Sequence, residues 1–148
     1  MLPNKLICSL LLSSLSCIAY AQDISGIWQN IDDKTGSPKG VIEIRKENDG
    51  TFTGTVVKVT PRSGYTPRTT CVDCPAPYTN KAILGLDVLK GLKSTGQNEY
   101  SGGKILDPLT GKIYSTKAKL SSNGKRLQLR GYVGVSALGR SQIWIRAN

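Results

Sequence analysis

A chain of 148 residues with a net charge of +10 is long enough for one hydrophobic core and too short for several domains. It contains no histidine, which excludes Ser-His-Asp and Cys-His catalysis, histidine-ligated metal sites and imidazole pH switches. The basic residues include no run of five, so the charge favours a soluble basic surface over attraction to an anionic partner such as a membrane surface, and nucleic acid is not expected.

Residues 1–21 have the features of a secretory signal peptide. Lys5 supplies the positive charge, residues 6–15 are apolar, and Ala19 and Ala21 frame a small-x-small cleavage site. We therefore expect an exported protein, periplasmic or secreted, with a single mature domain over residues 22–148. A lipoprotein anchored at Cys17 is the minor alternative, because Ser14 stands where a lipobox has an aliphatic residue. No later segment offers the roughly 20 apolar residues of a transmembrane helix.

The mature chain consists of short segments in which apolar and polar residues alternate, separated by Gly, Pro, Asn and Ser. Such alternation predicts antiparallel strands joined by tight turns. We predict eight strands, at residues 24–30, 41–46, 51–60, 81–92, 99–106, 112–120, 126–133 and 140–147. Residues 81–92 also fit a helical spacing, but Gly85 and Gly91 oppose a stable helix.

Eight strands in one domain indicate an all-β fold. We expect a single antiparallel up-and-down β-barrel, with a β-sandwich as the alternative. A barrel leaves no exposed edge strand, which favours it. An eight-stranded barrel can also hold one small ligand in its interior.

Two parts of the sequence are ambiguous about which side chains face inward. Tyr114 lies on the apolar face of its strand and is a candidate ligand contact through its hydroxyl. Arg130 and Tyr132 are further ligand candidates, although they alternate with the aliphatic residues of their strand. In the last strand we assign Ile143 and Ile145 to the interior, which would place Trp144 and Arg146 outside; the opposite assignment stays open.

Cys71 and Cys74 lie in an irregular, proline-rich segment over residues 61–80. In an exported protein this pair is expected to form a disulfide that fixes the long loop. A redox-active pair is the alternative, but the spacing lacks the βαβ setting of such sites. A zinc site would need two more ligands, so no metal site is predicted. The carboxylates of Asp32, Asp33 and Asp107 lie in turns, where they accept local hydrogen bonds.

The sequence resembles the bacterial exported family catalogued as domain of unknown function 2147. The resemblance covers the mature chain and rests on Gly26-Ile27-Trp28, Cys71-Val72-Asp73-Cys74, Tyr100 to Pro108, Arg130-Gly131-Tyr132, Gly139-Arg140, Trp144 and Arg146. It implies a small barrel of the lipocalin and fatty-acid-binding kind, without an assigned activity. It also implies that Trp28 closes the base of the barrel and that a late arginine, Arg140 or Arg146, packs across it.

These observations together predict a non-enzymatic barrel, without catalytic residues or cofactor, that binds a small apolar or anionic amphipathic ligand. A filled barrel that acts as an envelope or protein-interaction module is one alternative. A thiol redox protein acting through Cys71 and Cys74 is another. An internal cavity of a few hundred Å³ would distinguish the first hypothesis from the second.

Overall fold

The computed structural model describes residues 22–61, 64 and 66–147, so the predicted signal peptide and Cys17 lie outside the described residues. Within these described residues, eight strands and one 3₁₀ turn follow one another. They are β1 (Gly26–Ile31), β2 (Pro38–Lys46), β3 (Phe52–Val59), β4 (Asp87–Gly96), β5 (Glu99–Leu106), β6 (Ile113–Leu120), β7 (Arg126–Tyr132), η1 (Ser136–Leu138) and β8 (Arg140–Ala147).

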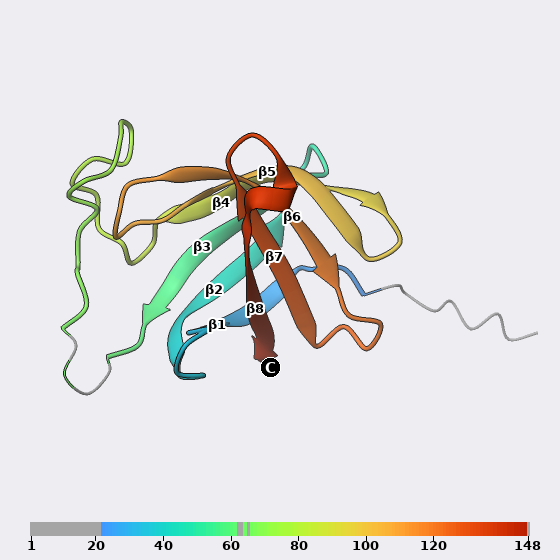
Figure 1. Cartoon of the computed structure of the whole chain (residues 1–148), viewed down its shortest axis with the longest axis horizontal. Coiled ribbons are helices and arrows are strands. Elements are labelled where there is room, and N and C mark those ends of the chain that lie inside the picture. Colours follow the sequence, from blue (N-terminus) through green and yellow to red (C-terminus); the bar gives the residue numbers. More distant parts are fainter. Residues whose placement is uncertain (1–21, 62–63, 65, 148) are drawn as a thin grey trace, which may run out of the picture.

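Each strand pairs antiparallel with the next one, and β8 returns to pair with β1, so the sheet is a closed barrel (Figure 1). Trp28 on β1 lies opposite Arg146 on β8, and Asn30 lies opposite Trp144. The predicted up-and-down barrel is therefore confirmed, and the sandwich alternative is wrong. Closure pairs the first and the last strand with each other. In a sandwich these strands would be sheet edges with unpaired backbone groups.

The largest difference from the predicted elements is in β4, which spans Asp87–Gly96 instead of residues 81–92. The chain before β4 contains a turn at Gly85, whose φ of +86° favours glycine and interrupts an extended strand. The strand then continues through polar residues to Gly96, because pairing with β5 satisfies its backbone hydrogen bonds. β4 therefore continues past the apolar residues from which the strand was predicted, because main-chain pairing with β5 stabilises it.

The two ends of the barrel differ in their packing. At one end, Ile24, Trp28 and Leu92 are fully buried, and the rings of Phe52 and Tyr100 meet edge to face at 5.5 Å between centroids. The opposite end is framed by the β1–β2, β3–β4, β5–β6 and β7–β8 loops and opens into a cavity. Among the described residues, no helix has the length and apolar character needed to cross a membrane.

Candidate ligand-binding site

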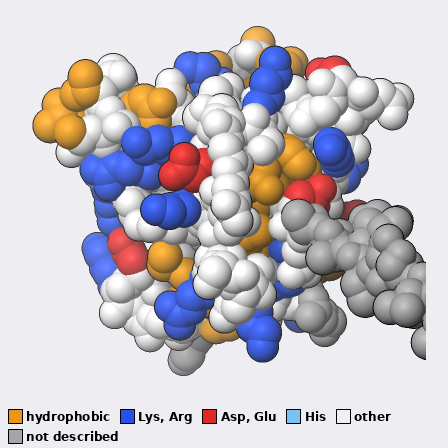
Figure 2. Space-filling model, turned by 90° about the vertical axis from the view of Figure 1, so that its right-hand side faces the viewer, with side chains coloured by type: hydrophobic (Ala, Val, Ile, Leu, Met, Phe, Trp, Pro, Cys, Tyr) orange, Lys and Arg blue, Asp and Glu red, His pale blue; other side chains and the backbone are white. Residues whose placement is uncertain are grey.

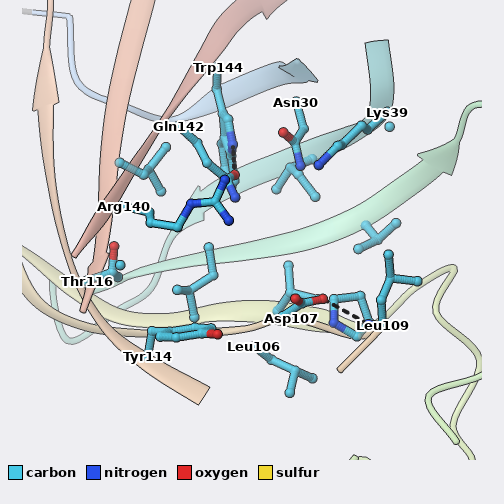
Figure 3. Close-up of a pocket in the computed structure, with 18 of the residues that line it drawn as sticks. Asn30, Lys39, Leu106, Asp107, Leu109, Tyr114, Thr116, Arg140, Gln142 and Trp144 are labelled. Carbon is cyan, nitrogen blue, oxygen red and sulfur yellow. Dashed lines mark hydrogen bonds between the residues drawn. The ribbon is translucent and has the colours of Figure 1, made fainter. Parts of the chain in front are cut away.

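The barrel contains a cavity of ≈ 620 Å³ that opens between the four loops at one end (Figure 3). This volume lies within the range of small-molecule sites, which is about 300–1,000 Å³. The inner part of the cavity is apolar. Its buried apolar lining consists of Ile42, Val56, Ile83, Val88, Leu106, Leu129 and Trp144.

The last strand presents its polar and aromatic face to this cavity. Trp144 is 1% exposed and lies opposite the buried Leu127, whereas Ile143 is 37% exposed. The inward assignment of Ile143 and Ile145 was therefore wrong. The large indole buries more apolar surface than an isoleucine would, and its N–H donates to the Gln142 side chain at 3.3 Å.

Two polar side chains of the wall, Asn30 and Gln142, were not predicted from the sequence. Asn30 lies opposite Trp144, and its Oδ1 is buried without a hydrogen-bond partner among the described residues. Gln142 lies opposite Leu129, so it shares the inward face of the wall. The sequence did contain a signal for Asn30. Side chains alternate between the two faces of a strand, so Asn30, two residues after Trp28, faces the same side as Trp28.

The three predicted ligand contacts occupy different positions. Tyr114 lines the cavity and points its hydroxyl into it (Figure 3). Tyr132 also contributes to the lining. Arg130 lies outside the barrel, because it faces Lys117 on the outer side and donates to the carbonyl oxygens of Ser136 and Ala137. The aliphatic residues of β7 face the interior. Because side chains alternate along the strand, Arg130 faces outward and does not line the cavity.

Charged side chains surround the opening. Lys39 pairs with Asp32 at 3.8 Å, and Arg140 pairs with Asp33 at 3.0 Å. The Arg140 side chain is 80% exposed and extends toward the middle of the opening (Figure 3). Asp107 accepts a hydrogen bond from the Leu109 backbone at 2.9 Å, as the turn chemistry predicts.

At the opposite end, Arg146 stacks on Trp28, with 4.3 Å between the guanidinium carbon and the ring centroid. Arg140 is six residues away along β8 and lies at the open end, so it takes no part in this closure. Burial is the main cause that lowers the pKa of Arg146 from its ordinary value. Burial likewise raises the pKa of the nearby Tyr100 hydroxyl, with the charge of Asp23 adding to the effect.

The long β3–β4 loop forms one side of the opening and contains the Cys71–Cys74 disulfide, so the predicted bond is present. Both cysteines are buried, and the Cys74 sulfur lies 3.7 Å from the Pro108 carbonyl oxygen in the β5–β6 turn. The disulfide closes a short turn within the loop, and this turn packs against the β5–β6 turn. No group of three or more Cys, Asp or Glu side chains within the described part of the chain is arranged to hold a metal ion.

The sequence matches a bacterial family, and the fold is similar to a solved structure. A family model described as an uncharacterized protein conserved in bacteria (DUF2147) matches residues 26–146. Protein HP1028 of Helicobacter pylori, described as belonging to the lipocalin family, is similar with a TM-score of 0.71 and 23% identity, over 85% of this chain and 84% of that chain. No match was found among curated proteins. At this identity the likeness shows the fold alone, which is a lipocalin-like barrel.

Proposed function

We propose that this chain, which belongs to the bacterial family DUF2147, binds a small amphipathic molecule in the cavity of its barrel. The observation that carries the proposal is the ≈ 620 Å³ cavity, with an apolar inner wall and charged side chains at its opening. The proposed ligand has an apolar body and an anionic head group. Binding involves no chemical step, and the features of residues 1–21 support its taking place outside the cytoplasm.

The inner wall supports binding of an apolar body. Each Å² of apolar ligand surface removed from water contributes about 25 cal/mol, before the cost of association. Leu129, Val56 and Trp144 supply such a surface from different strands. A filled barrel would lack this space, so the cavity favours ligand binding over the purely structural alternative.

The opening supports an anionic head group. A guanidinium has five N–H donors, and Arg140 directs one of them to Asp33. The exposed guanidinium can therefore share its charge with a ligand carboxylate at the mouth. The buried disulfide gives little support to the redox alternative, because thiol–disulfide exchange requires access to a sulfur atom.

A fluorescent long-chain carboxylate and its methyl ester test the proposal together. We expect the purified protein to bind both probes, because both carry the apolar body. Arg140→Gln is expected to weaken binding of the carboxylate about tenfold and to leave the ester unchanged, since one charge-assisted hydrogen bond is lost. Arg126→Gln, at an exposed arginine outside the cavity, is the matched control and should change neither.

A second variant tests the location of the ligand. Leu129→Trp places a larger ring in the cavity and should abolish binding of both probes, with circular dichroism confirming that the barrel still folds. Absence of binding by the unmodified protein would refute the proposal. Equal losses for Arg140→Gln and Arg126→Gln would refute the role of the opening in recognising an anion.

A further inference from the structure

The loop between β7 and β8 presents large apolar side chains to solvent beside the opening of the cavity. Val133, Val135 and Leu138 are 72%, 58% and 81% exposed. Residues 131–139 contain no charged side chain. Single exposed apolar residues are ordinary, but three within six positions form a concentrated apolar tip.

This loop is held in its projecting conformation by cations beneath it. Arg130 donates to the carbonyl oxygens of Ser136 and Ala137, and Lys117 donates to the Ser136 hydroxyl at 3.1 Å. These bonds fix the η1 turn at the top of the loop. The apolar side chains are therefore oriented outward before any partner arrives, which lowers the entropy cost of binding.

Cations outnumber carboxylates around the loop. Lys117, Arg130 and Arg140 flank it, of which Arg140 also pairs with Asp33, and the whole chain carries a net charge of +10. Figure 2 shows hydrophobic side chains projecting at the upper left, with Lys and Arg side chains below them and an acidic side chain beside these cations. An apolar tip bordered by cations complements the surface of an anionic lipid bilayer, where cations meet head groups and apolar side chains enter the boundary with the acyl chains.

From this arrangement we propose that the β7–β8 loop docks the open end of the barrel on the surface of an anionic lipid bilayer. A protein partner is the less favoured occupant, because a stable protein interface buries more than about 1,000 Å², which three side chains do not provide. A bilayer requires only a few inserted apolar side chains together with nearby cations.

The docking would bring the cavity against lipid. Val133 and Leu138 line the cavity and are also mostly exposed, so a bilayer that covers them also covers the opening. An amphipathic molecule could then pass between the membrane and the barrel without crossing water. The inference goes beyond the proposed function, since docking on lipid requires no ligand in the cavity.

Flotation with vesicles tests the docking. We expect the unmodified protein to float with vesicles of equal parts phosphatidylglycerol and phosphatidylcholine, and to float less with phosphatidylcholine alone or at high salt. Val135→Ser/Leu138→Ser should lower the partition coefficient about tenfold, because two apolar side chains no longer leave water. Val57→Ser/Ile143→Ser removes two exposed aliphatic side chains from the strand walls and should change it little.

Two results would overturn the proposal. The first is absence of flotation with the anionic vesicles; if the same protein captures a defined protein in a manner that depends on Val135 and Leu138, the loop belongs to a protein partner. The second is an equal loss in both double variants, which would indicate diffuse attraction of the basic surface. Probe binding by protein that fails to float would refute only the docking.

Discussion

Asn30 on β1 lies directly opposite Trp144 on β8, at the seam where the last strand closes the barrel on the first. The two residues contribute differently to this wall of the barrel. The indole lines the cavity, and the amide oxygen beside it is buried without a hydrogen-bond partner in the part of the chain that the structure describes. The seam is therefore both a closure contact and part of the candidate binding surface.

Adjacent substitutions in β8 should have opposite consequences. Trp144→Ala is expected to lower the free energy of unfolding by about 3–5 kcal/mol, because it removes a buried ring and leaves a void. Ile143→Gln should change it by less than about 0.5 kcal/mol, because that side chain faces solvent. Urea denaturation measures both values. Comparable losses in the two variants would contradict the observed orientation of the strand.

Arg146 should contribute to stability through its hydrogen bonds as well as its charge. Its guanidinium donates to the carbonyl oxygens of Asp23, Ser25 and Gly124 at 2.6–2.7 Å, which ties the segment before β1 to the β6–β7 loop. Arg146→Lys keeps the charge but cannot reach three carbonyls, so we expect a loss of about 2 kcal/mol in denaturant unfolding. Arg126→Lys serves as the control, and an equal effect there would refute the prediction.

The carboxylate of Asp87 should make stability depend on pH in the acid range. Burial by itself raises the pKa of Asp87, but hydrogen bonds from Thr55 and Arg45 outweigh it and lower the pKa from its ordinary value. The ionised form therefore stabilises the fold above the unfolded pKa of about 3.9, and this contribution disappears as the pH falls through the lower folded pKa.

Asp87→Asn should accordingly reduce the decline in stability between neutral pH and the acid range, as measured by thermal unfolding at a series of pH values. Arg45→Gln should reduce it in the same direction, because it removes a donor from the same carboxylate. A decline as steep in both variants as in the unmodified protein would show that other carboxyl groups determine the acid response.

Loss of the Cys71–Cys74 bond should loosen one side of the opening. The loop that the bond closes is short, so Cys71→Ser/Cys74→Ser is expected to lower the free energy of unfolding by about 2 kcal/mol. Hydrogen exchange should accelerate in residues 69–83 and in the β5–β6 turn against which Cys74 packs, while β1 and β8 keep their protection. Uniform acceleration across the barrel would contradict a local role.

Local patterns in the sequence determined the number of strands and most of their positions. Alternation and turn residues such as Asp49-Gly50 specify hairpins within a few neighbouring residues, so the tertiary structure is not needed to find them. Barrel closure was predictable as a preference, since it removes edges. The start of β4 was not, because Lys81 to Leu86 has an apolar pattern whose backbone at Gly85 turns away from the sheet.

The sequence alone established an all-β domain with an even number of hairpin-spaced strands, a cysteine pair able to cross-link a loop, and the absence of histidine chemistry. Only the tertiary structure decided which face of β8 points inward, which arginine closes the base, and that the interior is hollow at one end. The reason is physical. Because side chains alternate along a strand, neighbouring residues face opposite sides of the sheet. Which of these sides is the interior depends on how residues distant in the sequence share the volume inside the closed barrel.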